Sequence, residues 1–92
     1  MINLPQPNQM KQNHKLTVIY YAVLRDQRGL DSETIETEAK TPLALFSKLK
    51  EEHGFSLKPE QMRVAVNDEI ADWQVKLAEN DVVVFLPPVA GG

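Results

Sequence analysis

The feature that most restricts the fold of this chain is a pair of apolar segments at opposite ends of its patterned region. Side chains from Leu16 to Leu24 alternate between two faces, and both sets are mostly apolar. The other segment, 82–86, reads Val-Val-Val-Phe-Leu without a break, as strands buried on both faces do. We therefore expect these two strands to pair in the middle of one sheet.

One helix is clearly marked between these strands. Thr41 can cap it, and Pro42 fits the first helical position, where a backbone N–H would have no partner. An apolar stripe at the helical period follows, made of Leu45, Phe46 and Leu49. Gly54 should end the helix in a left-handed conformation, directly after His53.

The remaining segments are short and partly extended. The range 32–38 alternates with a polar majority, which is typical of an edge strand. A third strand is expected over 62–67, followed by a turn at 67–68 and a short return strand that begins at Glu69 and Ile70. Trp73, Val75 and Leu77 lie two residues apart, which predicts partly extended backbone, and Asn80 should adopt a positive φ in the next turn.

This order of elements predicts an α+β fold of the ubiquitin-like β-grasp type. A mixed sheet would carry one main helix packed on one face, and a flexible C-terminal tail would follow the last strand. The 92 residues suit a single domain. We expect a disordered leader over residues 1–14, because it is rich in Asn, Gln and Pro, then the β-grasp domain over 15–86 and an extended tail over 87–92.

The composition argues against several classes of function. The net charge of −3 and the scattered Lys and Arg residues argue against nucleic acid. The chain has no cysteine, and His14 and His53 are isolated, so no metal site is expected. There is no phosphate-binding loop, no membrane-spanning run and no signal pattern, which favours a cytoplasmic protein that binds no cofactor by itself.

The central strands are apolar on both faces, but one helix can cover only one of them. An exposed apolar surface of a few hundred Å² usually marks a partner-binding site. The alternative is that loop residues such as Leu57 and Trp73 fold over the second face. We favour a partner, because the chain has few loops long enough to cover it, and weak self-association through the same face is plausible.

The C-terminal segment Pro87-Pro88-Val89-Ala90-Gly91-Gly92 directly follows the last apolar strand. Prolines cannot donate to a sheet and favour a stiff, extended exit. The side chains then become smaller from Val89 to Ala90 and are absent at the two glycines, which suits a tail that enters a narrow channel. Its terminal carboxylate is the accessible electrophile, and it is inert until it is activated, normally by adenylation. A glycine-rich terminus of no function is the alternative interpretation.

These stretches resemble the small subunits of molybdopterin synthase, which are sulfur carriers of the MoaD type. The matching segments are 20–26 (Tyr-Tyr-Ala-Val-Leu-Arg-Asp), 65–67 (Ala-Val-Asn), 77–86 and the tail 87–92, within a resemblance that covers roughly residues 15–92. Asn80 departs from the family, which usually has Gly there, and residues 1–14 have no counterpart.

The resemblance implies a function. An E1-like adenylating enzyme would activate the Gly92 carboxylate with ATP, and a sulfur donor would convert it to a thiocarboxylate. The tail would then enter the large subunit of a heterotetrameric synthase, where two sulfur transfers to a pyranopterin precursor build the dithiolene of molybdopterin. The small subunit would supply the sulfur and the large subunit the catalytic groups.

The resemblance also implies that Tyr21, Ile70 and Leu86 contact the large subunit, whereas ordinary core packing is the alternative for each. Two other functions remain open. One is a sulfur carrier for another pathway, such as thiamine thiazole synthesis, and the other is a ubiquitin-like modifier conjugated to lysines. A plain binding module with an inert tail is a further alternative.

Overall fold

The computed structural model describes residues 13–88 of the chain. Its elements follow in the order β1 (His14–Ile19), α1 (Ala22–Arg28), β2 (Ser32–Thr37), α2 (Pro42–His53), the 3₁₀ turn η2 (Pro59–Gln61), β3 (Arg63–Val66), β4 (Glu69–Ala71) and β5 (Val82–Leu86). The predicted tail residues Val89, Ala90, Gly91 and Gly92 lie outside the described residues, as do positions 1–12.

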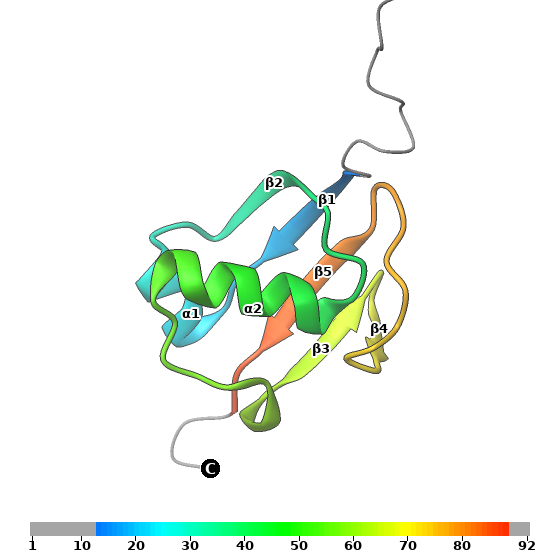
Figure 1. Cartoon of the computed structure of the whole chain (residues 1–92). Helices are drawn as coiled ribbons and strands as arrows, with labels where there is room; N and C mark the ends of the chain where they lie inside the picture. The colour runs from blue at the N-terminus through cyan, green and yellow to red at the C-terminus, as the bar shows by residue number, and fades with distance from the viewer. Residues whose placement is uncertain (1–12, 89–92) are drawn as a thin grey trace, which may run out of the picture.

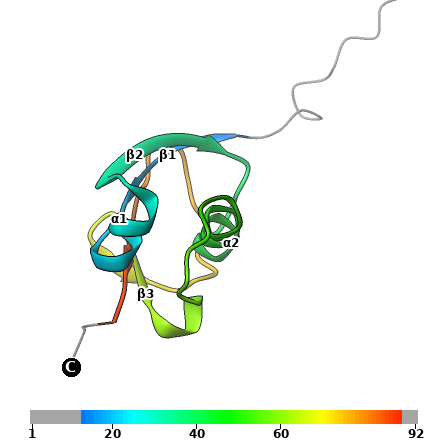
Figure 2. The ribbon, with the colours of Figure 1, turned by 90° about the vertical axis from the view of Figure 1, so that its left-hand side faces the viewer.

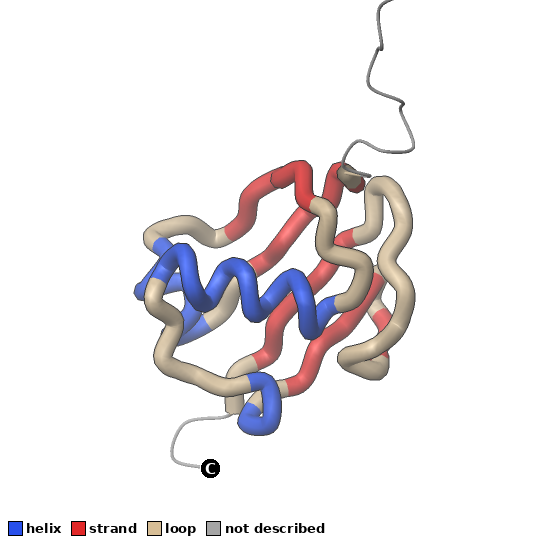
Figure 3. Tube along the Cα trace, viewed as in Figure 1, coloured by secondary structure: helices blue, strands red, loops and turns tan. Residues whose placement is uncertain are grey.

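The five strands form one mixed sheet in the order β2-β1-β5-β3-β4 (Figure 1). The two apolar strands β1 and β5 are parallel neighbours near its middle, as the sequence predicts, and the polar strand β2 lies at one edge. All other neighbouring pairs are antiparallel. Because β1 and β5 are parallel, both end at the same end of the sheet, and α1 follows β1 there (Figure 3).

Helix α2 crosses one face of the sheet, which gives two layers (Figure 2). The helix begins and ends at the predicted residues. The Thr41 side chain accepts a hydrogen bond from the Ala44 backbone N–H at 3.1 Å, and Gly54 caps the other end with φ 71°. Phe46 of α2 is fully buried, where its ring packs against the rings of Phe55, Trp73 and Phe85. This arrangement is the predicted ubiquitin-like β-grasp fold.

The prediction of one strand over residues 16–24 is wrong in its second half. β1 ends at Ile19, and the chain turns at Ala22, whose φ is 53°, into the short helix α1. Leu24 is fully buried from this helix rather than from a strand, and Gly29 ends it in a left-handed conformation. β1 also starts at His14, one residue inside the predicted leader, because His14 pairs with Thr37.

The expectation of extended backbone around Trp73 and Val75 is also wrong. The Val75 N–H donates to the Asp72 carbonyl at 3.1 Å, which closes a turn. Leu77 then donates to the Lys40 carbonyl at 2.8 Å, so this loop is attached near the start of α2. The turn at Asn80 is as predicted, with φ 71°.

No helix within residues 13–88 is long and apolar enough to cross a membrane. The cytoplasmic location stays a prediction.

Candidate functional site

The candidate site begins on the face of the sheet opposite α2. Alternation along β5 turns Val83 and Phe85 toward the helix, where both are fully buried, and turns Val84 and Leu86 to the other side. In β1 the same rule buries Leu16 and Val18, so Ile19 faces away from the helix. The second face is therefore apolar at the centre of the sheet.

Strand register extends this apolar surface across four strands. Ile19 pairs with Val84, Val84 with Ala65, and Ala65 with Ile70, and paired residues project from the same face. On the next row toward the tail, Leu86 pairs with Arg63. We call the surface made by Ile19, Tyr21, Ala65, Ile70, Val84 and Leu86 the open face.

Tyr21 joins the open face because the backbone stays extended for two residues beyond β1. Its φ and ψ are −127° and 153°, so it points opposite to Tyr20. Tyr20 is 1% exposed and Tyr21 is 47% exposed, which agrees with that alternation. Ile70 is still more open, at 58%. These are large apolar side chains held in water by rigid strands, which is typical of a docking surface.

Neither Trp73 nor Leu57 covers the open face. The Trp73 ring stacks on Phe85 with centroids 5.9 Å apart and meets Phe46 of α2 at 6.0 Å, so it packs on the helix side of the sheet. Leu57 also packs against the buried core. The alternative that these two residues fold over the second face is therefore wrong.

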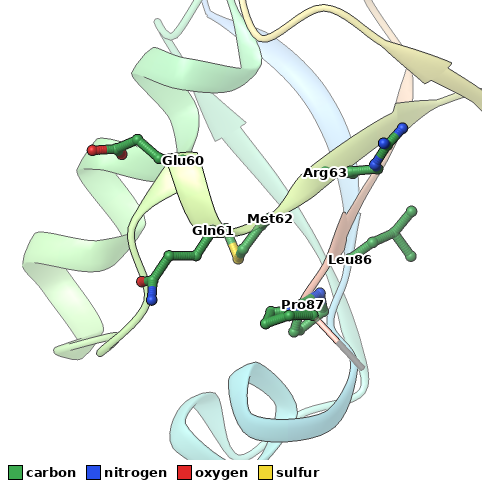
Figure 4. Close-up of a pocket in the computed structure, with 7 residues that line it drawn as sticks. Glu60, Gln61, Met62, Arg63, Leu86 and Pro87 are labelled. Carbon is green, nitrogen blue, oxygen red and sulfur yellow. The ribbon is translucent and has the colours of Figure 1, made fainter. Parts of the chain in front are cut away.

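The root of the tail lies at the end of the open face. Leu86 is half-buried, Pro87 is half-buried and Pro88 is exposed, and these residues follow directly from the central strand β5. A hollow of about 370 Å³ adjoins them, lined by Glu60, Gln61, Met62, Arg63, Leu86, Pro87 and Pro88 (Figure 4). The structure thus joins an apolar docking surface to the start of the tail through one rigid strand.

The structure brings together the described residues that the sequence singled out. Tyr21, Ile70 and Leu86 come from three different strands or their extensions, yet they share the open face. Their role as partner contacts stays a prediction. Ala65 and Val84 belong to the same surface but carry no local signal for it, and their register follows only once β3 and β5 are paired.

Cofactor and metal chemistry is not evident in the described part of the chain. Among residues 13–88, no group of three His, Asp or Glu side chains is placed to hold a metal ion. Shifted pKa values occur at Tyr20, Arg28 and Glu33, which form a hydrogen-bonded cluster between the end of β1, α1 and β2. The arrangement can present and position a tail, and the role of the tail as the reacting segment stays a prediction.

Comparison with known proteins gives one family. The ThiS family model matches residues 18–92. The molybdopterin synthase sulfur carrier subunit of Escherichia coli is 26% identical over 80 residues, which are 84% of this chain and 99% of that protein.

Solved structures agree with that result. A putative molybdopterin converting factor subunit 1 from Pyrococcus furiosus is 30% identical, with a TM-score of 0.69 over 83% of this chain and 99% of that chain. A complex of subunits 1 and 2 of the molybdopterin-converting factor from Helicobacter pylori contains a chain that is 25% identical, with a TM-score of 0.58 over 85% of this chain and 99% of that one.

A more distant structure shares the fold alone. The small archaeal modifier SAMP1 of Haloferax volcanii is 20% identical, with a TM-score of 0.68 over 85% of this chain and 99% of that chain.

The match to the ThiS model covers four of the five strands in full, both helices and the tail, and we conclude that this chain belongs to the ThiS family.

Proposed function

We propose that this chain is the sulfur carrier subunit of a molybdopterin synthase. The observation that carries the proposal is the continuity between the open face and the tail. β5 contributes Val84 and Leu86 to an exposed apolar surface and then leads directly into Pro87 and the C-terminal segment. A partner that covers the open face would thereby receive the tail in a fixed direction. The relatives from E. coli and P. furiosus support the choice of pathway.

In the proposed reaction, the Gly92 carboxylate attacks the α-phosphate of ATP on an E1-like adenylating partner. Pyrophosphate leaves, and a C-terminal acyl-adenylate forms. A persulfide sulfur of a donor then attacks the acyl carbon and displaces AMP, which gives an acyl disulfide. A thiol reductant cleaves the sulfur–sulfur bond, is itself oxidised to a disulfide, and leaves the thiocarboxylate. Carboxylates are poor electrophiles, so activation must precede sulfur transfer.

The second stage would take place in the large subunit. The thiocarboxylate sulfur is a nucleophile, and it would form a carbon–sulfur bond at an oxygen-bearing carbon of the pyranopterin precursor, where the carbon–oxygen bond breaks and the oxygen leaves. Hydrolysis of the resulting acyl bond returns the Gly92 carboxylate for another cycle. The H. pylori complex of subunits 1 and 2 supports a large-subunit partner. The present chain supplies docking and delivery, and the partner supplies acid–base groups and the precursor site.

Deletion of Gly92 tests the proposal. We expect the full-length chain, incubated with its adenylating enzyme, ATP and a sulfur source, to gain the mass difference between one sulfur and one oxygen. The chain lacking Gly92 should show no thiocarboxylate and should not support dithiolene formation by the large subunit, because the reacting carboxyl is drawn back by one residue. Its unfolding midpoint should be unchanged.

Ala90→Ser is the matched control, because it alters the tail but keeps its length and its terminal glycines. It should retain most of the sulfur transfer. Dithiolene formation by the chain lacking Gly92 would contradict the proposed mechanism. Covalent adducts on lysines of other proteins, with no thiocarboxylate, would instead indicate a protein modifier. A thiocarboxylate that the large subunit cannot use would indicate a carrier for another pathway.

A further inference from the structure

The hollow at the root of the tail differs from the rest of the open face in its charge. It lies where β3 begins and β5 ends, and Met62, Leu86 and Pro87 give it an apolar floor (Figure 4). Arg63 stands beside Leu86 on the same face, because the two residues are register partners. This position places Arg63 opposite the last residue of β5, and its side chain points away from Met62 and Pro87 (Figure 4).

Arg63 has no acidic partner within residues 13–88. It is exposed and takes part in none of the ion pairs or side-chain hydrogen bonds of the described chain. In the pairing of β3 with β4, Val64 lies opposite Ala71, so the position next to Arg63 on the neighbouring strand is Asp72. The Asp72 carboxylate accepts a hydrogen bond from the Gln74 N–H at 2.8 Å. Glu60 lines the hollow too, and it points away from Arg63 (Figure 4).

An unpaired arginine at the end of the apolar open face is suited to a particular kind of contact. The planar guanidinium offers several donors in a fixed fork that matches a carboxylate, and its weak hydration makes it common at protein interfaces. Leu86 and Pro87 would exclude water from one side of such a pair, which strengthens the attraction. The site therefore fits an acidic side chain that approaches along the open face.

We propose that Arg63 is a specificity-determining contact, which pairs with a carboxylate side chain of the large subunit when that subunit receives the tail. The inference rests on the proposed function and deepens it, because it names the chemistry that the partner must present at the tail root. Apolar contacts on the open face would supply most of the affinity, while the Arg63 pair would fix register and reject partners that place a cation there.

A protein carboxylate is favoured over the phosphates of a bound nucleotide. Adenylation takes place at Gly92, six residues beyond Leu86, and six extended residues span up to about 20 Å. A nucleotide at the end of an extended tail would lie too far away to meet Arg63. The carboxylate of the chain's own terminus is the other possible occupant, and the experiment below distinguishes it.

The test compares charge variants at the two ends of the open face. Arg63→Glu reverses the charge at the tail root, and Arg63→Gln removes it. Lys15→Glu is the matched control. Lys15 is an exposed cation that projects from β1 on the same side as Ile19, four residues earlier in the strand, and it lies at the end of the sheet away from the tail. Affinity for the purified large subunit would be measured by calorimetry at low and at physiological salt.

We expect Arg63→Glu to weaken binding at least tenfold, Arg63→Gln to weaken it severalfold with a smaller salt dependence, and Lys15→Glu to change it less than twofold. Thermal unfolding should be the same for both Arg63 variants, because this side chain is exposed. Lys15→Glu should unfold slightly earlier, because it places two carboxylates opposite each other across the pair of residues 15 and 36. An Arg63 variant that unfolds earlier would be replaced by Arg63→Lys, which keeps the charge but loses the fork and should bind between wild type and Arg63→Gln.

Three results would overturn the inference. Unchanged affinity of Arg63→Glu would show that no carboxylate meets Arg63, and equal losses in Arg63→Glu and Lys15→Glu would indicate a general effect of charge. Tighter binding by Arg63→Glu would indicate that the chain's own terminal carboxylate occupies the site. If the wild-type chain itself fails to bind the large subunit, the proposed function fails and this inference fails with it.

Discussion

At the scale of single residues, Tyr20, Arg28 and Glu33 form a cluster of side chains joined by hydrogen bonds. The Glu33 carboxylate accepts a hydrogen bond from the Tyr20 hydroxyl at 2.7 Å and two from the Arg28 guanidinium, each at 2.8 Å. These bonds tie β1, α1 and β2 together at one edge of the core. Burial, together with the hydrogen bond to Glu33, raises the pKa of Tyr20.

The same cluster makes stability depend on pH. The hydrogen bond from Arg28 lowers the pKa of Glu33 below its usual value, burial opposes the effect, and the bond from Tyr20 adds to it. Because the folded pKa is lower than the unfolded one, which is about 4.3, the unfolded chain binds more protons in the interval between them. The contribution of Glu33 is therefore complete above the unfolded pKa and is lost as pH falls through the folded pKa.

Glu33→Gln should reveal this contribution. We expect a loss of about 1.5–3 kcal/mol in the free energy of unfolding at pH 7, since hydrogen bonds to a charged group are removed from a side chain that is 15% exposed. The loss should shrink in acid, and the variant's stability should vary less with pH. Urea unfolding from pH 3 to pH 7 measures both effects.

Glu36→Gln is the control for that experiment, because Glu36 is an exposed residue of the same strand and pairs with Lys15. It should change the free energy of unfolding by less than about 0.5 kcal/mol at any pH. Parallel stability curves for Glu33→Gln and wild type would argue against the ion pair as the source of the pH dependence.

At the scale of elements, α2 shows how far local signals can fix a structure. Its cap, its first-position proline and its terminal glycine all occupy the roles that the sequence assigns to them. Thr41→Ala should cost about 1 kcal/mol in the free energy of unfolding, because it leaves a backbone N–H at the start of the helix without its partner. Chemical denaturation gives the value directly.

Ser47→Ala provides a comparison within the same helix. Ser47 is exposed in the middle of α2, and alanine has the higher helix propensity, so this change should be neutral or slightly stabilising. Equal losses from Thr41→Ala and Ser47→Ala would mean that loss of a hydroxyl, rather than loss of the cap, destabilises the helix.

The short helix α1 shows the limit of local signals. Val23 and the preceding tyrosines favour a strand, while Arg25, Gln27 and Arg28 are good helix formers. The decision comes from pairing, because the register of β1 with β2 ends at Ile19 opposite Ser32. One more bond follows on that side, from the Tyr20 N–H to the Asp31 carbonyl at 2.8 Å, and the chain then enters α1, which buries Leu24 in the core.

Side-chain hydrogen bonds join the turn before β5 to the turn after β3. The Asn67 side chain accepts from the Val82 N–H at 2.9 Å and donates to the Asp81 carboxylate at 2.9 Å. Asp81 in turn accepts from the Ala78 N–H at 2.7 Å. The turns at 67–68 and at Asn80 are both evident in the sequence. The hydrogen bonds that join them depend on the pairing of β3 with β5.

At the scale of the whole molecule, the two faces of the sheet differ in how much of their apolar surface is buried. The face toward α2 is closed by the helix and by Trp73, whereas Tyr21 and Ile70 remain exposed on the other. Tyr21→Asp should weaken binding to the large subunit at least tenfold, because a charge would be buried in an apolar interface. The free energy of unfolding should change little, since Tyr21 is 47% exposed.

Val75→Asp is the control for the open face. Val75 is also a large exposed apolar residue, at 37%, and its loop is attached near the start of α2 on the helix side. It should leave affinity for the large subunit within about twofold of wild type, as substitutions outside an interface do. Comparable losses from both variants would place the partner surface elsewhere.

The sequence by itself determined the edge position of β2, the limits of α2, the pairing of β1 with β5 and the fold class. These features follow from local periodicity and from capping chemistry, which act between residues close in the chain. The sequence also predicts that the tail is the functional segment, through its prolines and glycines.

Tertiary structure decided what local patterns leave open. The end of β1 depends on where β2 stops, and the side on which Trp73 packs depends on the space beside Phe46 and Phe85. The row from Ile19 to Ile70 exists only through strand register, because its residues are far apart in the sequence. Periodicity predicts which strands are central, but it does not give the register between them, and in this protein the register places Arg63 opposite Leu86.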